Sequence, residues 1–204
     1  DDNPVLSPLL VSRKDAFVGR FVDMLREAGI VVDASLGEAR KPSDAFCICH
    51  RFHTMDQVLL RMLKDSDNLY AEAMFYQLAA SSGNRPATAK DARSVVRHLV
   101  TKLGFSADGY AFADGSGLSL YNYVSAELEM AMLKYAYRNN NIMLHLRPSL
   151  PIAATDGTLR NRMSGPFTNG NVVAKTGTLT GISSLAGYCK SANGHDLAFV
   201  ILNQ

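Results

Sequence analysis

The chain has 204 residues, of which 47% are hydrophobic and 20% are charged, and its formal net charge is +2. This length and composition are typical of a globular protein with one sizeable core, or of one domain with part of another. The small net charge gives no reason to expect nucleic acid or an anionic membrane as a partner. No apolar stretch approaches the ~20 residues that are needed to cross a bilayer.

The first quarter of the chain predicts one helix and two short strands. Residues 15–28 are expected to be helical because Phe17, Phe21 and Leu25 recur every four residues, and Gly29 can end the helix. The apolar runs at 30–32 and 45–51 predict strands. The polar segment between them, 37–44, predicts a loop.

Three cysteines, Cys47, Cys49 and Cys189, are too few for a disulfide framework. Cys47 and Cys49 would share one face of a strand, and His50 and His53 follow closely, so a metal site is conceivable. Structural zinc usually requires two ligand pairs at set spacings. Buried thiols are therefore the favoured prediction, and no metal is expected.

The next part of the chain predicts three amphipathic helices. The first starts at Thr54, with Gln57 in the capping-box position, and ends near Lys64. The second follows directly and is expected to run past residue 78. The third is capped by Thr88 and ends before Gly104.

Ser66, Asp67 and Asn68 lie at the joint between the first two of these helices. Ser, Asp and Asn are all favoured N-caps, so the triplet could serve only to cap the second helix. The same spacing of Ser and Asn recurs in two Gly-containing turns. Only the first copy lies between two apolar helices, where short polar side chains could point into a cleft.

Further on, 114–119 and 155–159 predict turns, and the first lacks the lysine and the strand–helix setting of a phosphate-binding loop. Ser125 is expected to cap a helix that ends near Arg138, where three asparagines break it.

Three β-rich runs follow at 172–178, 183–190 and 197–202, with an Asn-Gly hairpin signal between the last two. Helices in front of an antiparallel sheet predict an α+β fold.

The first of these β-rich runs carries Lys175, Thr176 and Gly177. A cation, a hydroxyl and a residue without a Cβ atom are suited to holding an extended, carboxylate-ended peptide beside an edge strand. The alternative is a threonine-rich edge strand that a lysine protects from aggregation.

Together, Ser66-Asp67-Asn68 and Lys175-Thr176-Gly177 match two of the three signature motifs of penicillin-binding proteins and class A β-lactamases. The stretches 64–72, 114–119, 156–162 and 175–179 resemble the class C low-molecular-mass penicillin-binding proteins, which are D-alanyl-D-alanine carboxypeptidase/endopeptidases. The resemblance implies a helical subdomain against an antiparallel sheet flanked by helices. It implies no cofactor.

The resemblance also implies substrates, inhibitors and roles. The substrates would be peptidoglycan stem peptides, cut in the cell envelope or periplasm through an acyl-enzyme that β-lactams also form. Ser66 would relay a proton and Asn68 would hold the substrate amide. Lys175 and Thr176, with Gly177 beside them, would anchor the terminal carboxylate. The N–H of Thr178 would supply half of the oxyanion hole.

The third signature motif, Ser-x-x-Lys, which carries the nucleophile, is absent from the chain. We therefore expect residues 1–204 to be the C-terminal portion of one penicillin-binding domain, with that motif and an inserted region upstream. The polar start carries no signal peptide, so a leader would lie elsewhere or have been removed. The isolated chain is predicted to be inactive. The apolar run 197–202 would need cover from outside it.

Three alternatives remain open. A non-catalytic relative that binds peptidoglycan peptides would also lack the nucleophile, and a β-lactamase shares the same motifs. A Ser-His-Asp hydrolase is the weakest alternative, because no histidine adjoins a recognisable nucleophile. The histidines available for it are His50, His53, His98, His145 and His195.

Overall fold

The computed structural model describes residues 12–33 and 40–203, and the chain divides into two compact units, Asp1–His50 and Arg51–Gln204. The described part of the first unit contains one helix, α1 (Arg13–Glu27). Ser12 caps this helix by accepting a hydrogen bond from the N–H of Asp15, at 3.1 Å. Gly29 follows the helix with a φ of +81°. The predicted helix is confirmed, although Phe17 and Phe21 on its apolar side are exposed.

The two strands predicted in this first quarter are wrong. Residues 30–33 and 45–51 have no strand structure, and Val31, Phe46 and Ile48 are each at least 83% exposed. A strand needs a neighbour to pair its backbone groups, and these runs have none in the described chain. Cys47 and Cys49 are likewise exposed rather than buried. Part of the predicted loop at 37–44 lies outside the described residues.

The second unit begins with three helices at the predicted places: α2 (Met55–Lys64), α3 (Asn68–Ser81) and α4 (Ala89–Lys102). The capping box between Thr54 and Gln57 is formed, with distances of 3.0 and 3.3 Å. Thr88 forms a second capping box with Asp91. Local sequence signals therefore fixed where these helices start.

Two more helices, α5 (Ala126–Tyr137) and α6 (Asn140–Ser149), precede the sheet, and short 3-10 turns lie at Ala107–Gly109 (η2) and Gly157–Leu159 (η3). Helix α6 was not predicted. The helix capped by Ser125 ends near Arg138 as predicted, but the asparagines also start α6, because Asn139 accepts a hydrogen bond from the N–H of Ile142 at 3.3 Å. Pro148 lies in the last turn of α6.

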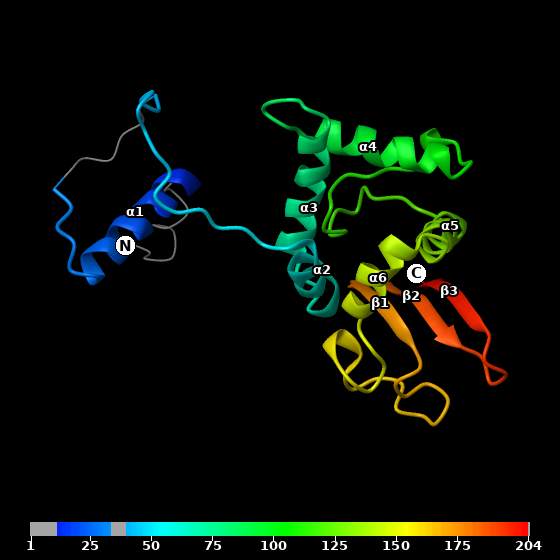
Figure 1. Cartoon of the computed structure of the whole chain (residues 1–204). Helices are drawn as coiled ribbons and strands as arrows, with labels where there is room; N and C mark the ends of the chain where they lie inside the picture. The colour runs from blue at the N-terminus through cyan, green and yellow to red at the C-terminus, as the bar shows by residue number, and fades with distance from the viewer. Residues whose placement is uncertain (1–11, 34–39, 204) are drawn as a thin grey trace, which may run out of the picture. The chain divides into compact units, whose positions relative to one another are not determined.

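The sheet has three antiparallel strands, β1 (Val173–Leu179), β2 (Ile182–Lys190) and β3 (Asp196–Asn203), in the order β1-β2-β3 (Figure 1). Lys175 pairs with Ala186 and Gly177 with Ser184. The hairpin between β2 and β3 turns at Gly194, whose φ is +85°. The predicted strands, the hairpin and the α+β class are confirmed.

The two faces of the sheet are covered by different parts of the chain. One face packs its central residues against α2, α5 and α6, and Tyr188 is fully buried there with its hydroxyl donating to the carbonyl of Leu133 at 2.8 Å. The other face packs Ala174 against Ala153 and Leu159 from the connection between α6 and β1. Because side chains alternate along a strand, Lys175 shares a face with Val173, on the helical side.

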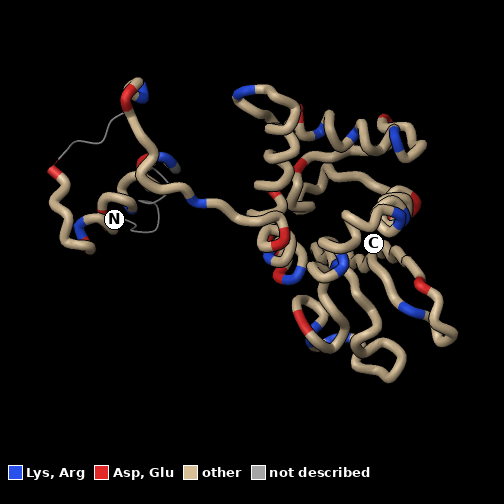
Figure 2. The backbone as a smooth tube through the Cα atoms, in the orientation of Figure 1, with Lys and Arg blue, Asp and Glu red and all other residues tan. Residues whose placement is uncertain are grey.

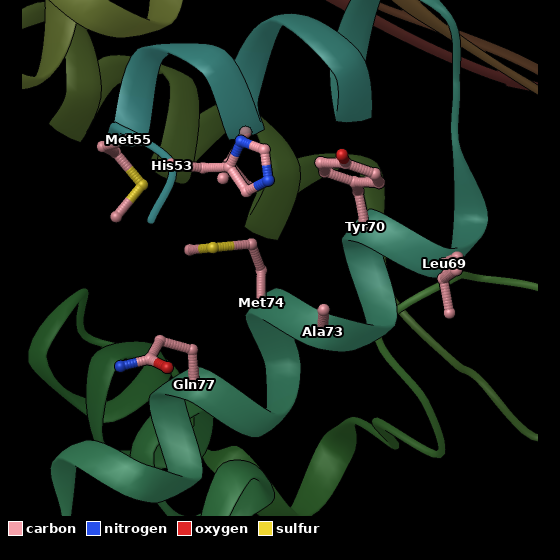
Figure 3. Close-up of a pocket in the computed structure, with 8 residues that line it drawn as sticks. His53, Met55, Leu69, Tyr70, Ala73, Met74 and Gln77 are labelled. Atoms are coloured by element: carbon pink, nitrogen blue, oxygen red, sulfur yellow. The ribbon is translucent and has the colours of Figure 1, made fainter. Parts of the chain in front are cut away.

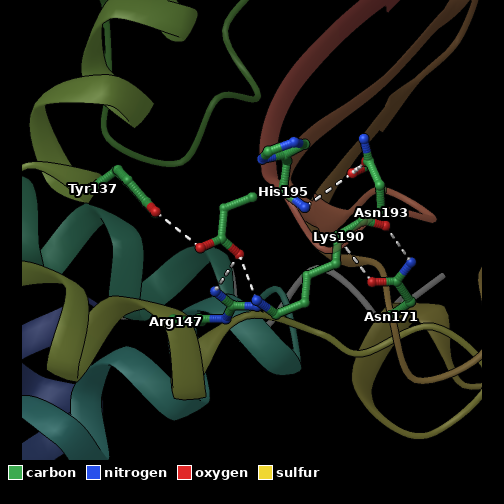
Figure 4. A network of polar contacts seen from close by, with 8 residues as sticks. Tyr137, Arg147, Asn171, Lys190, Asn193 and His195 are labelled. Atoms are coloured by element: carbon green, nitrogen blue, oxygen red, sulfur yellow. Dashed lines mark hydrogen bonds and ion pairs between the residues drawn. The ribbon is translucent and has the colours of Figure 1, made fainter.

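A polar cluster fixes α5 and α6 to the end of the sheet where β2 ends and β3 starts. The carboxylate of Asp196 accepts from the hydroxyl of Tyr137 at 2.9 Å and lies 3.1 Å from the ammonium of Lys190 and 3.9 Å from the guanidinium of Arg147 (Figure 4). Elsewhere in this unit, Lys and Arg are spread over helices, loops and strands, with Asp and Glu among them (Figure 2).

The outer strand β3 keeps part of its apolar run exposed. Leu197, Ile201 and Leu202 are between 39% and 55% exposed. Across the described helices, none is both long enough and apolar enough to span a bilayer.

Candidate active site

The two clusters predicted to form the site are in contact. The ammonium of Lys175, on β1, donates to the hydroxyl of Ser66 at 2.7 Å and to the carbonyl of Thr176 at 2.6 Å. Ser66 lies in the joint between α2 and α3, 109 residues before Lys175. The helical joint and the strand therefore share one polar centre.

The joint leaves the Ser66 hydroxyl available because Asp67, not Ser66, caps α3. Asp67 accepts from the N–H groups of Leu69 and Tyr70 at 3.0 and 3.3 Å. Arg61 bonds Asp67 and holds the pKa of that carboxyl below its usual value. Ser66 itself has a φ of +55°, a left-handed conformation that costs a residue with a side chain about 1–2 kcal/mol. Strain of this kind is common where a side chain must be aimed at a functional partner.

Asn68 is the first residue of α3, and its side chain is exposed. In the part of the chain that the structure describes, it bonds neither Ser66 nor Lys175. Its predicted role, contact with the substrate amide, remains a prediction.

Beyond Ala174, no described segment pairs with the outer edge of β1, which lies beside Lys175. The N–H of Ala174 faces this edge and donates to the carbonyl of Pro151 at 2.9 Å. Because backbone groups alternate along a strand, the N–H groups of Thr176 and Thr178 face the same edge, beyond the last residue that the 151–153 segment pairs. An extended peptide could add there as a further strand, which is the geometry the sequence predicted.

Gly177 leaves space for a neighbouring side chain of the sheet, which the sequence did not suggest. A Cβ atom at this position would lie 2.3 Å from the hydroxyl oxygen of Ser184, on the paired strand β2. The missing side chain thus makes room for Ser184 inside the sheet.

Sequence reasoning missed the residues that support this centre. The Thr176 hydroxyl bonds the Thr158 hydroxyl at 2.8 Å, and the Lys64 ammonium bonds a carboxylate oxygen of Asp156 at 2.5 Å. Thr158 and Asp156 belong to 156–162, one of the stretches that resemble the penicillin-binding proteins. That resemblance was the sequence signal that could have identified them. The polar side chains of Lys64 and Thr158 help line a hollow of about 260 Å³.

A second, more apolar cavity of about 580 Å³ lies between the start of α2 and α3. His53, Met55 and Met74 gather around it, and Tyr70 and Gln77 contribute from the same face of α3 (Figure 3). Neither Ser66 nor Lys175 lines it, so this cavity is separate from the polar centre.

Two of the alternatives, a metal site and a Ser-His-Asp site, depend on histidine side chains. No group of metal-ligating side chains occurs in 12–33 or 40–203. The ring of His145 bonds Asp56 at 2.5 Å, but Ser149 donates to the carbonyl of His145 rather than to its ring. That arrangement does not activate a serine.

Burial lowers the pKa of Lys175 below its usual value of 10.5. A lysine with a depressed native pKa destabilises the fold while it is charged, and this penalty disappears as the pH rises from the native pKa to the unfolded one. The free energy of unfolding of the native chain, minus that of Lys175→Met, should therefore increase with pH in this window. Urea denaturation of both proteins across alkaline pH would measure it. A flat or falling difference would contradict the lowered pKa.

The D-Ala-D-Ala carboxypeptidase 3 (S13) family matches residues 6–204. The chain is 33% identical over 195 residues to the D-alanyl-D-alanine carboxypeptidase DacB of Haemophilus influenzae, covering 93% of this chain and 40% of that protein. The crystal structure of penicillin binding protein 4 (dacB) from Haemophilus influenzae, complexed with a β-lactam, superposes with a TM-score of 0.80 at 32% identity. That match covers 95% of this chain and 46% of the other.

A β-lactamase shares the fold. The extended-spectrum β-lactamase TLA-1 aligns with a TM-score of 0.53 at 19% identity, over 74% of this chain and 55% of that one. The predicted fold, like that of penicillin-binding proteins and β-lactamases, is therefore confirmed. With a family match over nearly the whole chain and a paired serine and lysine at the predicted positions, the chain belongs to the D-Ala-D-Ala carboxypeptidase 3 (S13) family.

Proposed function

We propose that the protein containing this chain is a serine-type D-Ala-D-Ala carboxypeptidase that cuts peptidoglycan stem peptides through an acyl-enzyme. The observation that carries the proposal is the 2.7 Å bond between Lys175 and Ser66, which joins two signature motifs into one centre. Family membership and the β-lactam complex of the Haemophilus influenzae relative support it. Residues 1–204 would be the C-terminal portion of one penicillin-binding domain, acting in the periplasm or cell envelope.

In this proposal the described residues bind the substrate and move a proton. The open edge of β1 pairs with the extended peptide, while Lys175 and Thr176 hold the terminal carboxylate and Asn68 holds the preceding amide. The N–H of Thr178 donates a hydrogen bond to the oxyanion that forms as the carbonyl is attacked. Ser66 passes a proton to the leaving amine as the peptide bond breaks and an ester to the nucleophilic serine forms.

The nucleophile would come from a Ser-x-x-Lys motif outside these 204 residues, since the sequence contains none. A fluorescent penicillin should therefore label the full-length protein covalently and leave the isolated chain unlabelled. Electrophoresis under denaturing conditions would detect the adduct, with heat-denatured protein as the control. Labelling of the isolated chain would refute its predicted inactivity.

Two other outcomes would redirect the proposal. A full-length protein that binds D-Ala-D-Ala peptides but neither cuts them nor reacts with penicillin would be a non-catalytic binding relative. One that hydrolyses penicillin rapidly and leaves D-Ala-D-Ala peptides intact would be a β-lactamase. Product analysis with both substrates separates the three cases.

A further inference from the structure

The loop at 151–159 lies between the two halves of the candidate site, and its first residues pair with β1. Ile152 forms a bridge with Val173, and the N–H of Ala153 donates to the carbonyl of Val172 at 2.9 Å. The loop is thus fixed to the strand that carries Lys175 and Thr176, immediately before those residues.

The same loop is bonded to the end of α2 through one lysine. The ammonium of Lys64 donates to the Leu150 carbonyl at 3.0 Å and to Asp156 at 2.5 Å. The side chains of Lys64 and Asp156 are only 18% and 30% exposed, so solvent screens this pair less than a surface pair. The other oxygen of Asp156 accepts from the N–H of Ile152 at 2.8 Å, which ties the carboxylate to its own loop.

The backbone of the loop also approaches α2 closely. Gly157 has a φ of +53°, and a Cβ atom there would lie 2.6 Å from the carbonyl oxygen of Lys64. Only glycine fits both this conformation and this contact. The loop is therefore held against α2 by an ion pair and by close packing.

Each end of this connection leads to a site residue. Lys64 lies two residues before Ser66 in the chain, and Thr158, two residues after Asp156, bonds the Thr176 hydroxyl at 2.8 Å. A shift of the loop relative to α2 would move Ser66 with respect to Lys175 and Thr176. Displacements of about 1 Å at a catalytic centre can cost about 10²-fold in rate.

We propose that Lys64 and Asp156 are positioning residues, whose ion pair sets the distance between the Ser66–Lys175 centre and the Thr176 hydroxyl. The inference rests on the proposed function and deepens it, because it names the residues that hold the two motifs in register. Neither residue contacts the substrate in this account.

The test is the rate of acylation of the full-length protein by a fluorescent penicillin. Lys64→Met and Asp156→Asn should each slow acylation by about ten- to a hundredfold. The double variant should be no slower than the slower single variant, because both changes break the same pair. Lys64→Arg keeps the charge and the donors and should restore most of the rate.

A matched control removes an ion pair elsewhere in the same unit. Arg97, on α4, pairs with Asp108 in η2, and Arg97→Met removes one positive charge away from the site. Thermal denaturation of every variant would accompany the rates. Arg97→Met should leave acylation unchanged whatever it does to stability.

The outcomes separate this inference from the proposed function. If the unmodified full-length protein is not acylated, the proposed function fails and the inference fails with it. If that protein reacts and Lys64→Met reacts equally fast, the inference alone is overturned. It is also overturned if Lys64→Arg is as slow as Lys64→Met, or if rates simply follow thermal stability across all variants.

Discussion

Replacing Lys175 with methionine in the full-length protein is expected to slow acylation by penicillin by about 10²–10³-fold. The ammonium of Lys175 reaches the Ser66 hydroxyl at 2.7 Å and stands at the open edge of β1. In the proposed mechanism, its loss would remove both the charge that holds the substrate carboxylate and the hydrogen-bond partner of the Ser66 hydroxyl. Stopped-flow measurement of the acylation rate would give the size of the effect.

Lys190→Met is the matched control for this experiment. Lys190 is on β2 of the same sheet, but its ammonium pairs with Asp196 at the end remote from the site (Figure 4). Acylation by Lys190→Met should equal that of the unmodified protein. If the two lysine variants lose activity equally, the prediction that Lys175 acts directly in acylation is wrong.

Removing the Ser66 hydroxyl should have the second large effect. Both Ser66→Gly and Ser66→Ala lack the hydroxyl that is proposed to relay a proton, so each is expected to lower the rate of acylation by about 10²-fold or more. Their stabilities should differ, because Ser66 has a φ of +55°. Glycine adopts this conformation without strain, whereas alanine keeps a cost of about 1–2 kcal/mol.

Glycine also has more conformational freedom than alanine in the unfolded chain. This lowers the free energy of unfolding by about 0.5–1 kcal/mol and offsets part of that relief. Ser66→Gly should therefore be more stable than Ser66→Ala, by up to about 1.5 kcal/mol. Urea denaturation of the two variants measures this difference, since both lose the bond to Lys175. A more stable alanine variant would show that the left-handed backbone at Ser66 is not strained.

Where the sequence prediction succeeded, the signal was local. The caps at Thr54 and Thr88 and the hairpin at Gly194 were all predictable because each depends on residues within one turn of the chain. Where it failed, a distant partner decided. The runs at 30–32 and 45–51 have strand-like composition but no strand beside them.

Helix α6 shows the opposite error. Its asparagines predicted only the end of the preceding helix, but Met143 and Leu146 pack against the buried cluster that contains Tyr188, and this burial stabilises α6. The burial of an apolar face contributes more than an unfavourable residue near a helix end costs.

The sequence by itself determined the family motifs, the starts of most helices, the three strands and the placement of Lys175 on the same face as Val173. The tertiary structure alone decided that Lys175 meets Ser66 across 109 residues, and that Lys64 meets Asp156 across 92. The physical reason is that capping and alternation act over a few residues. The approach of distant polar groups is set by how the apolar faces of helices, loop and sheet pack together.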